Sequence, residues 1–215
     1  MDIKGECVYI FVIACGTAFA EVTLTPELQT PNNSIKNQME NIMAVIPKDQ
    51  FDKIANEHLK NDEGFQAAIK YFKGEEWKNN TDILLNHPHW ISLKNLLEDA
   101  GIDLDNYIDN LVSFIVNVKT PDDVPSDAKK DLKPFIEDLR KAMPTTEIFD
   151  KLESTIMITP EYEKMFEKLS SPESRKALET SYKVPEFKKI VQSLIEMGIQ
   201  VNEIINAIYV FLGWH

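Results

Sequence analysis

Two histidines form the one arrangement in this chain that resembles part of a zinc site. His87 and His89 flank Pro88, and two imidazoles so close together could share a metal ion. A zinc site needs a third and a fourth ligand, however, and this segment does not supply them. We therefore interpret the segment as a turn between two helices, with no metal bound.

Three aspartates at short intervals suggest calcium. Asp103, Asp105 and Asp109 supply carboxylates, but an EF-hand loop needs an oxygen ligand at its fifth position and a glycine at its sixth. This chain has Tyr107 and Ile108 at those positions. Helix capping and a solvated helix face account for the aspartates without a metal.

The sequence contains no pattern typical of catalysis. It lacks a G-x-S-x-G elbow, a glycine-rich phosphate loop and an H-E-x-x-H pair, and it has 7 glycines in all. Both cysteines, Cys7 and Cys15, lie in the first twenty residues. We expect a protein that is not an enzyme and that needs no cofactor for catalysis.

The first residues have the composition of a secretory signal. Lys4 precedes an almost wholly apolar run over 7–19, and small residues at Ala18 and Ala20 favour cleavage before Glu21. A membrane anchor is the alternative, but spanning a bilayer needs about 20 apolar residues and this run is shorter. We predict a signal peptide over 1–20, an extension over 21–33 and a secreted mature chain without disulfides.

The net charge of the chain limits the classes of molecule that it can bind. The net charge of −12 repels nucleic acid and disfavours electrostatic docking on anionic lipid surfaces, although it leaves hydrophobic contact with lipid open.

Two Asn-x-Ser/Thr sequons become meaningful if the chain is secreted. They predict glycosylation of Asn32 and Asn79. The alternative is that Ser34 and Thr81 cap helices.

A repeat of about 97 residues is the strongest pattern in the chain. Three pairs of helix-breaking residues keep this interval: Pro47 and Pro144, Pro88 and Pro185, Gly101 and Gly198. Apolar residues keep it too: Trp90 and Phe187, Leu93 and Ile190, Leu97 and Leu194, Leu104 and Val201, Ile108 and Ile205, Leu111 and Ile208, Ile115 and Leu212. Such a repeat preserves a packing pattern rather than a set of reactive groups.

Helical periodicity runs through both copies. We expect repeat 1 over 34–117, a connector over 118–126 that holds two prolines, and repeat 2 over 127–215. The first copy predicts helices over 34–45, 49–59, 61–72, 75–85, 88–101 and 103–115. The second copy predicts helix starts at Ser126 or Asp127, Thr145, Thr159, Ser171 and Val184, and a last helix that ends near Leu212. Helices this short depend on tertiary packing, and the fold class is all-α with twelve of them.

The most apolar stretch of the mature chain, 199–212, could suggest a membrane span. Asn202, Glu203 and Asn206 interrupt it on one side, and it matches 102–115 of the first copy. We interpret it as a buried core helix.

The repeat unit resembles the insect allergen-related repeat family, which includes cockroach group 1 allergens and midgut microvillar proteins of blood-feeding flies. The shared features are Ile-Pro at 46–47, Phe-Asp-Lys-Ile/Leu at 51–54 and 149–152, a proline before the aromatics Trp90 and Phe187, and the last helix from 201. The resemblance covers 35–215. It implies a helical capsule of two six-helix repeats around a large apolar cavity that holds fatty acids or phospholipids, in a protein of the digestive tract.

The resemblance implies that the apolar stripes of both copies line this cavity. The expected lining residues are Phe51, Ile54, Ile69, Phe72, Leu93, Leu97, Ile108, Leu111, Ile115, Phe149, Leu152, Phe166, Leu169, Ile190, Leu194, Ile205, Ile208 and Leu212. Solid packing of stripe against stripe is the alternative. At about 24 cal/mol per Å³, an empty void of roughly 500 Å³ would cost on the order of 12 kcal/mol, so a cavity of this size should hold lipid.

The sequence thus leads to a secreted lipid-binding protein of the gut lumen or microvillar surface. We expect it to exchange lipids with membranes and thereby to disrupt cells or enveloped viruses. The alternative is a structural or adhesive helical repeat of the gut lining without a lipid cavity. The sequence leaves the oligomeric state open.

Overall fold

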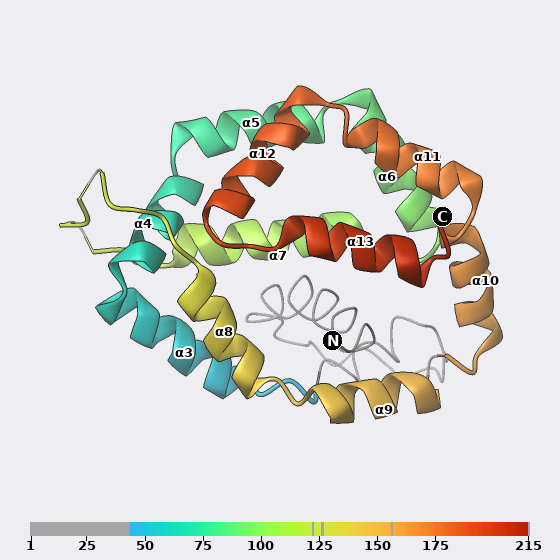
Figure 1. The fold of residues 1–215 in the computed structure, drawn as a ribbon, viewed down its shortest axis with the longest axis horizontal. Helices are drawn as coiled ribbons and strands as arrows, with labels where there is room; N and C mark the ends of the chain where they lie inside the picture. The colour runs from blue at the N-terminus through green and yellow to red at the C-terminus, as the bar shows by residue number, and fades with distance from the viewer. Residues whose placement is uncertain (1–43, 122, 126, 156, 215) are drawn as a thin grey trace, which may run out of the picture.

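The computed structural model describes residues 44–121, 123–125, 127–155 and 157–214, which fold into eleven helices and no strand (Figure 1). The helices are α3 Lys48–Asn61, α4 Glu63–Phe72, α5 Glu75–Leu85, α6 Pro88–Asp99, α7 Leu104–Asn117, α8 Lys133–Ala142, α9 Thr145–Thr155, α10 Pro160–Leu169, α11 Pro172–Ser181, α12 Pro185–Glu196 and α13 Val201–Phe211. The all-α fold class is confirmed for these residues. The predicted signal peptide and extension lie outside them.

Side-chain caps mark the starts of several helices. The Asp62 carboxylate accepts the backbone N–H of Phe65 at 3.0 Å and so caps α4, and the Thr159 hydroxyl accepts that of Tyr162 at 3.2 Å before α10. Ser171 caps α11 in the same way. Each cap satisfies an N–H that has no partner inside its helix, and the starts predicted for these helices are confirmed.

Three described glycines follow helix ends in the left-handed conformation, and one of them, Gly213 with φ +67°, follows α13. Gly101 follows α6 with φ +87° and Gly198 follows α12 with φ +91°. A side chain is strained in this region, which explains why glycine keeps these positions.

The helix starts repeat along the chain. The first residues of α3, α4, α5, α6 and α7 recur 97 positions later as the first residues of α9, α10, α11, α12 and α13. The interval found in the sequence is therefore also an interval between helices.

The prediction for the helix that opens the second copy was wrong at its start. It was expected from Ser126 or Asp127, but α8 begins at Lys133. The backbone N–H of Asp131 donates to the Gly64 carbonyl at 3.1 Å, and that of Leu132 donates to the Met197 carbonyl at 2.8 Å. These bonds to distant segments hold the chain in a non-helical path until α8 begins.

The helix predicted over 34–45 lies outside the described residues except for its last two positions, which form a turn.

The helices follow a closed outline in Figure 1, and α7 and α13 run lengthwise across its middle. Contacts between the two halves join α5 to α12, α6 to α11 and α3 to α8. One tightly packed cluster lies where α4 meets the segment before α8 and the end of α12. It consists of Phe65, Ala68, Ile69, Leu132 and Met197.

No single described helix has the length and apolarity to cross a bilayer. Only when α12 and α13 are taken together are the described residues long and apolar enough, and these two helices are bent by 114° relative to each other. Most of the stretch 199–212 forms α13, in which Ala207 is buried.

Candidate functional site

The residues predicted to line a cavity differ in how deeply they are buried. Of the seventeen whose side chains are described, three are buried and fourteen are partly buried, and none is exposed. The buried ones are Ile69, Leu93 and Leu212. The partly buried ones are Phe51, Ile54, Phe72, Leu97, Ile108, Ile115, Phe149, Leu152, Phe166, Leu169, Ile190, Leu194, Ile205 and Ile208. Leu111 lies in α7, but its side chain is outside the described set.

Two of these residues belong to close packing around α4. Ile69 is a member of the tightly packed cluster, and Phe72 packs against it. The Phe72 ring also lies 4.7 Å from that of Trp77, measured between centroids. This end of the molecule therefore has a filled interior.

A second aromatic group joins α10 to α13. The Phe166 ring lies 5.5 Å from the Phe211 ring and 6.1 Å from the Tyr162 ring, between centroids. Burial raises the pKa of the Tyr162 phenol.

A third aromatic group lies where α6 meets α11 and α12. The rings of Trp90 and Phe187 have centroids 6.1 Å apart, and Tyr182 lies 5.4 Å from Phe187. The Ser181 hydroxyl, which is fully buried, donates to the carbonyl of His89 at 3.0 Å. The sequence showed that Trp90 and Phe187 are equivalent, but not that they meet.

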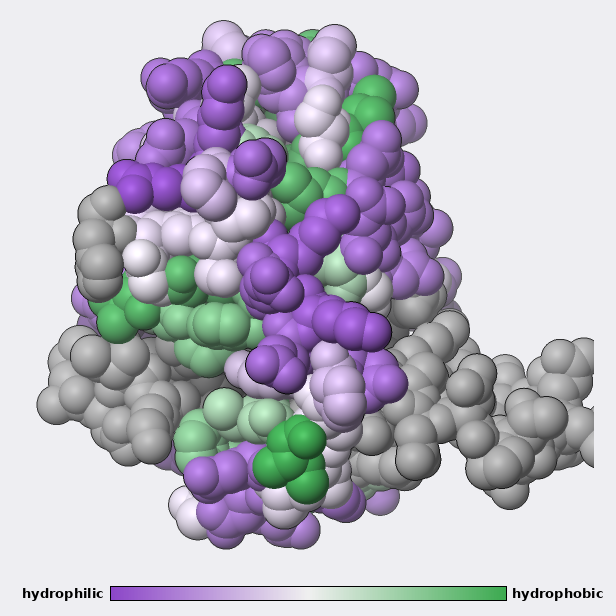
Figure 2. Space-filling model, turned by 90° about the vertical axis from the view of Figure 1, so that its right-hand side faces the viewer, coloured by the Kyte–Doolittle hydropathy of each residue, from purple (hydrophilic) through white to green (hydrophobic). Residues whose placement is uncertain are grey.

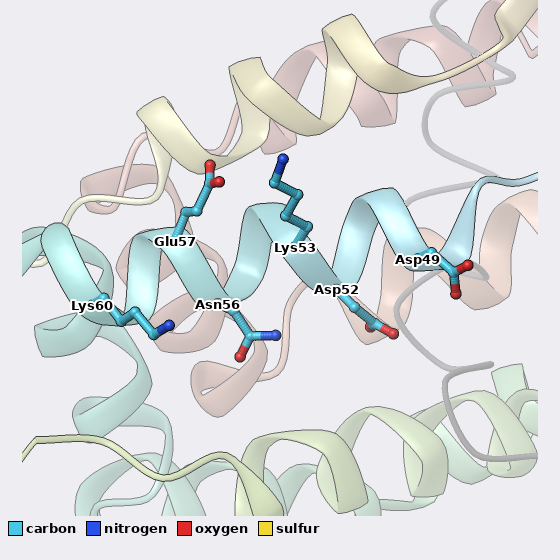
Figure 3. Close-up of a pocket in the computed structure, with 6 residues that line it drawn as sticks. All are labelled: Asp49, Asp52, Lys53, Asn56, Glu57 and Lys60. Atoms are coloured by element: carbon cyan, nitrogen blue, oxygen red, sulfur yellow. The ribbon is translucent and has the colours of Figure 1, made fainter.

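Two surface depressions in the described part of the chain are lined mainly by charged and polar residues. One, of about 690 Å³, lies along α3 and is lined by Asp49, Asp52, Lys53, Asn56, Glu57 and Lys60. Figure 3 shows Lys53 and Glu57 pointing toward α8, and Asp52 and Asn56 pointing away from it. These side chains come from one helix face and suit water and ions rather than acyl chains.

The other depression, of about 560 Å³, lies between α6, α10 and α11. An ion pair of Asp99 and Lys168 at 3.2 Å crosses it, and Ser92, Asn95 and Glu173 contribute to its lining. Leu96 and Ser171 complete a lining of mixed character, and the depression is open to the surface, unlike the enclosed apolar chamber expected from the resemblance.

A histidine that carried no signal in the sequence links three elements. His58 Nδ1 lies 2.7 Å from Asp62 Oδ2, and Nε2 lies 3.3 Å from Asp138 Oδ2 on α8. Its ring packs against those of Phe65 and Phe135, which also contact each other. A hydrogen bond from Lys141, and after it one from His58, lowers the pKa of the Asp138 carboxyl. The group fastens α3 to α8.

The candidate metal ligands have structural roles. The His87 ring accepts the backbone N–H of His89 at 3.2 Å and caps α6, so the predicted helix start is confirmed. Asp105 pairs with Lys94 at 2.7 Å. Within the described residues, no three His, Cys, Asp or Glu side chains converge to hold a metal.

One sequon lies within the described residues. Asn79 is exposed on α5, while Asn32 lies outside the described residues. The suggestion that Thr81 caps a helix was wrong, because it lies within α5 and its hydroxyl donates to the carbonyls of Trp77 and Lys78.

Apolar surface interrupts the hydrophilic exterior. Figure 2, which faces α10 and α11, shows a hydrophobic and near-neutral band below a hydrophilic area. Two helices, α9 and α13, end toward this side in Figure 1. Each has a pair of exposed apolar residues near its end: Met157 and Ile158 come after α9, and Val210 and Phe211 lie at the end of α13.

The fold defines a class: over the described residues it is an all-helical protein in which five helix starts recur 97 positions later. A family model described as "Insect allergen related repeat, nitrile-specifier detoxification" matches residues 34–205. The chain therefore belongs to the insect allergen-related repeat family. It is also similar to Protein G12 of Anopheles gambiae, at 21% identity over 210 residues that cover 95% of this chain and 98% of that protein.

Proposed function

We propose that this protein is a secreted, non-enzymatic lipid carrier of the gut lumen or microvillar surface. In this proposal two copies of a six-helix unit enclose one apolar chamber, and fatty acids or phospholipids fill it. Membership in the insect allergen-related repeat family supports the proposal.

The observation that carries the proposal is the partial burial of the apolar stripes. Close-packed interiors bury their large apolar side chains almost completely. Here fourteen of seventeen described stripe residues stay partly accessible, although none is on the exposed exterior. Apolar side chains in that condition are suited to contact with acyl chains.

Contacts between the two halves of the chain support a single enclosing unit. They join α5 to α12 and α6 to α11. The tightly packed cluster at α4 provides a rigid end.

Exchange with membranes would proceed through hydrophobic contact. The net charge of −12 opposes attraction to anionic lipid, whereas exposed apolar side chains such as Ile158, at 74% exposure, can touch hydrocarbon. We therefore expect transfer to neutral vesicles to be at least as fast as transfer to anionic ones.

Native mass spectrometry of the purified protein tests the carrier function. We expect additional mass that organic extraction and lipid analysis assign to fatty acids or phospholipids. The bare polypeptide, with or without glycans, would instead support a structural or adhesive role in the gut lining.

A leakage and transfer assay tests membrane exchange separately. Lipid-loaded protein is mixed with dye-filled phosphatidylcholine vesicles and with vesicles that carry a fluorescent fatty acid. Absence of both leakage and transfer at every loading would remove the exchange function and leave the carrier function standing.

A further inference from the structure

One buried donor in the junction of α6 with α11 and α12 has no acceptor. The indole N–H of Trp90 is shielded from solvent, and no hydrogen-bond partner for it occurs among the described residues. An indole nitrogen can only donate, and a buried donor normally has an acceptor in the protein or in something bound to it. The described protein atoms therefore leave this N–H without an acceptor.

Another tryptophan of the chain shows how the fold satisfies such a group when it does so internally. Trp214 is buried, and its indole N–H donates to the carbonyl oxygen of Ser170 at 3.1 Å. The two residues thus differ in one respect that can be tested. The indole N–H of Trp214 makes a hydrogen bond within the protein, whereas the indole N–H of Trp90 does not.

The place of Trp90 connects this donor to the apolar stripes. Trp90, Leu93 and Leu97 recur at helical spacing on α6, so they share one face of that helix. The Trp90 ring meets Phe187, which begins the corresponding stripe on α12. The donor therefore lies at the junction of the two stripes on which the proposed chamber depends.

The neighbouring groups restrict the ligand chemistry. Phe187 has no side-chain hydrogen-bonding atom, the hydroxyl of Ser181 already donates to the His89 carbonyl, and the Tyr182 phenol, whose ring contacts that of Phe187, is a neutral group. Neutral donors in an apolar setting favour a neutral oxygen acceptor, because a buried anion needs a countercharge. An acyl carbonyl, from a protonated fatty acid or from an acyl ester, has this chemistry.

We propose that the indole N–H of Trp90 donates to the acyl carbonyl oxygen of the bound lipid and so positions its polar end. This proposal rests on the lipid-carrier function. Because the equivalent residue Phe187 has no N–H, the junction provides one such donor and not two, and the two halves of the chain hold the lipid differently.

The variant Trp90→Phe keeps an aromatic ring and removes the donor. Binding to the full chain, freed of lipid by solvent extraction, is measured for oleic acid, for methyl oleate and for 1-octadecene, which has no oxygen. We expect Trp90→Phe to weaken binding of at least one carbonyl ligand about 5- to 10-fold and to leave 1-octadecene unchanged. A loss confined to oleic acid identifies the free acid as the source of the carbonyl, and a loss confined to methyl oleate identifies the ester.

Trp214→Phe is the matched control. It leaves the Ser170 carbonyl without its donor, so we expect a lower Tm and the same relative affinities for the three ligands. Trp90→Phe, which removes an unsatisfied donor, should leave the Tm of the lipid-free protein unchanged or higher. The indole N–H resonance of Trp90, identified by its loss in the variant, should move downfield with a carbonyl ligand and not with 1-octadecene.

Two results overturn the proposal. Trp90→Phe could weaken all three ligands equally or none of them, which would reduce Trp90 to a packing residue. The Trp90 resonance could respond to 1-octadecene as it does to methyl oleate. If the wild-type protein binds none of the three ligands, the carrier function itself fails, and this proposal fails with it.

Discussion

Trp90 and Phe187 hold equivalent positions 97 residues apart, and their rings face each other with centroids 6.1 Å apart and planes at 41°. The helices around them follow the same rule. Helix α11 is the equivalent of α5 in the second copy, and α12 is the equivalent of α6. The contact of α5 with α12 is therefore equivalent to the contact of α11 with α6. Two copies related by a two-fold axis are expected to pair in this way, with equivalent residues meeting at the axis.

The junction should contribute strongly to stability. Phe187→Ala removes a partly buried ring that contacts Trp90 and Tyr182, so we expect a loss of about 2 to 4 kcal/mol in the free energy of unfolding. Urea denaturation followed by circular dichroism measures it. Phe211→Ala removes a ring that is 46% exposed and should cost less than about 1.5 kcal/mol. An equal loss for both variants would contradict a central role of the junction.

Gly101 and Gly198, which occupy equivalent positions in the two copies, form a matched pair of left-handed glycines. Gly101→Ala adds a methyl group with no atom within 4 Å, so strain at positive φ should cost about 1 kcal/mol. Gly198→Ala adds the same strain, and its methyl group would also lie 3.0 Å from Cβ of Lys133. We expect a loss of about 2 to 3 kcal/mol there. Equal losses in chemical denaturation would show that the contact with Lys133 relaxes without cost.

The fastening of α3 to α8 should depend on acid pH. Hydrogen bonds from Lys141 and His58 lower the pKa of Asp138 below its ordinary 3.8. A carboxyl with a lowered pKa stabilises the fold above its unfolded-state value, and this contribution is lost as the pH falls through the folded-state value. We expect Asp138→Asn to lower the Tm by roughly 1 to 3 °C at pH 7 and the difference to shrink below pH 3.8.

Thermal melts between pH 7 and pH 2.5 measure this effect. Glu137→Gln on the same helix is the control, since Glu137 pairs with Lys133 at 4.0 Å and does not touch His58. A Tm difference for Asp138→Asn that stays constant down to pH 2.5 would contradict the assignment.

Removal of lipid should destabilise the protein. A ligand at about 100 times its Kd stabilises the folded state by about 2.7 kcal/mol, which corresponds to roughly 5 to 10 °C in Tm for a chain of this size. Calorimetry before and after solvent extraction measures the change, and adding oleic acid back should restore the Tm. An unchanged Tm after verified extraction would mean that lipid is not part of the folded state.

Enlarging a side chain distinguishes a chamber from solid packing. Leu194→Trp places extra volume on the stripe of α12, and we expect it to reduce the amount of bound lipid while the Tm of the lipid-free protein stays nearly constant. Ala68→Leu enlarges a fully buried residue of the tightly packed cluster and should cost about 1 to 3 kcal/mol. A comparable loss for Leu194→Trp would indicate that the stripe of α12 is already packed.

The sequence by itself determined where most helices begin. Asp62, Thr159 and Ser171 cap helices through bonds to residues three positions further on, so the signal and its effect lie within one turn. The prolines that open α6, α10, α11 and α12 act over the same short range. Periodicity likewise showed which face of each helix is apolar.

Only the tertiary structure decided what each of these faces meets. The start of α8 moved because the N–H groups of Asp131 and Leu132 bond to Gly64 and Met197, far away in sequence. His58 gained its role from Asp138, eighty residues further on.

The same holds for the candidate site. Ile69 and Leu194 look alike as stripe residues, yet Ile69 is buried in the packed cluster and Leu194 is partly accessible. Periodicity records that a side chain avoids water. Whether that side chain contacts another side chain or a ligand depends on the distances between helices. No local sequence pattern encodes these distances.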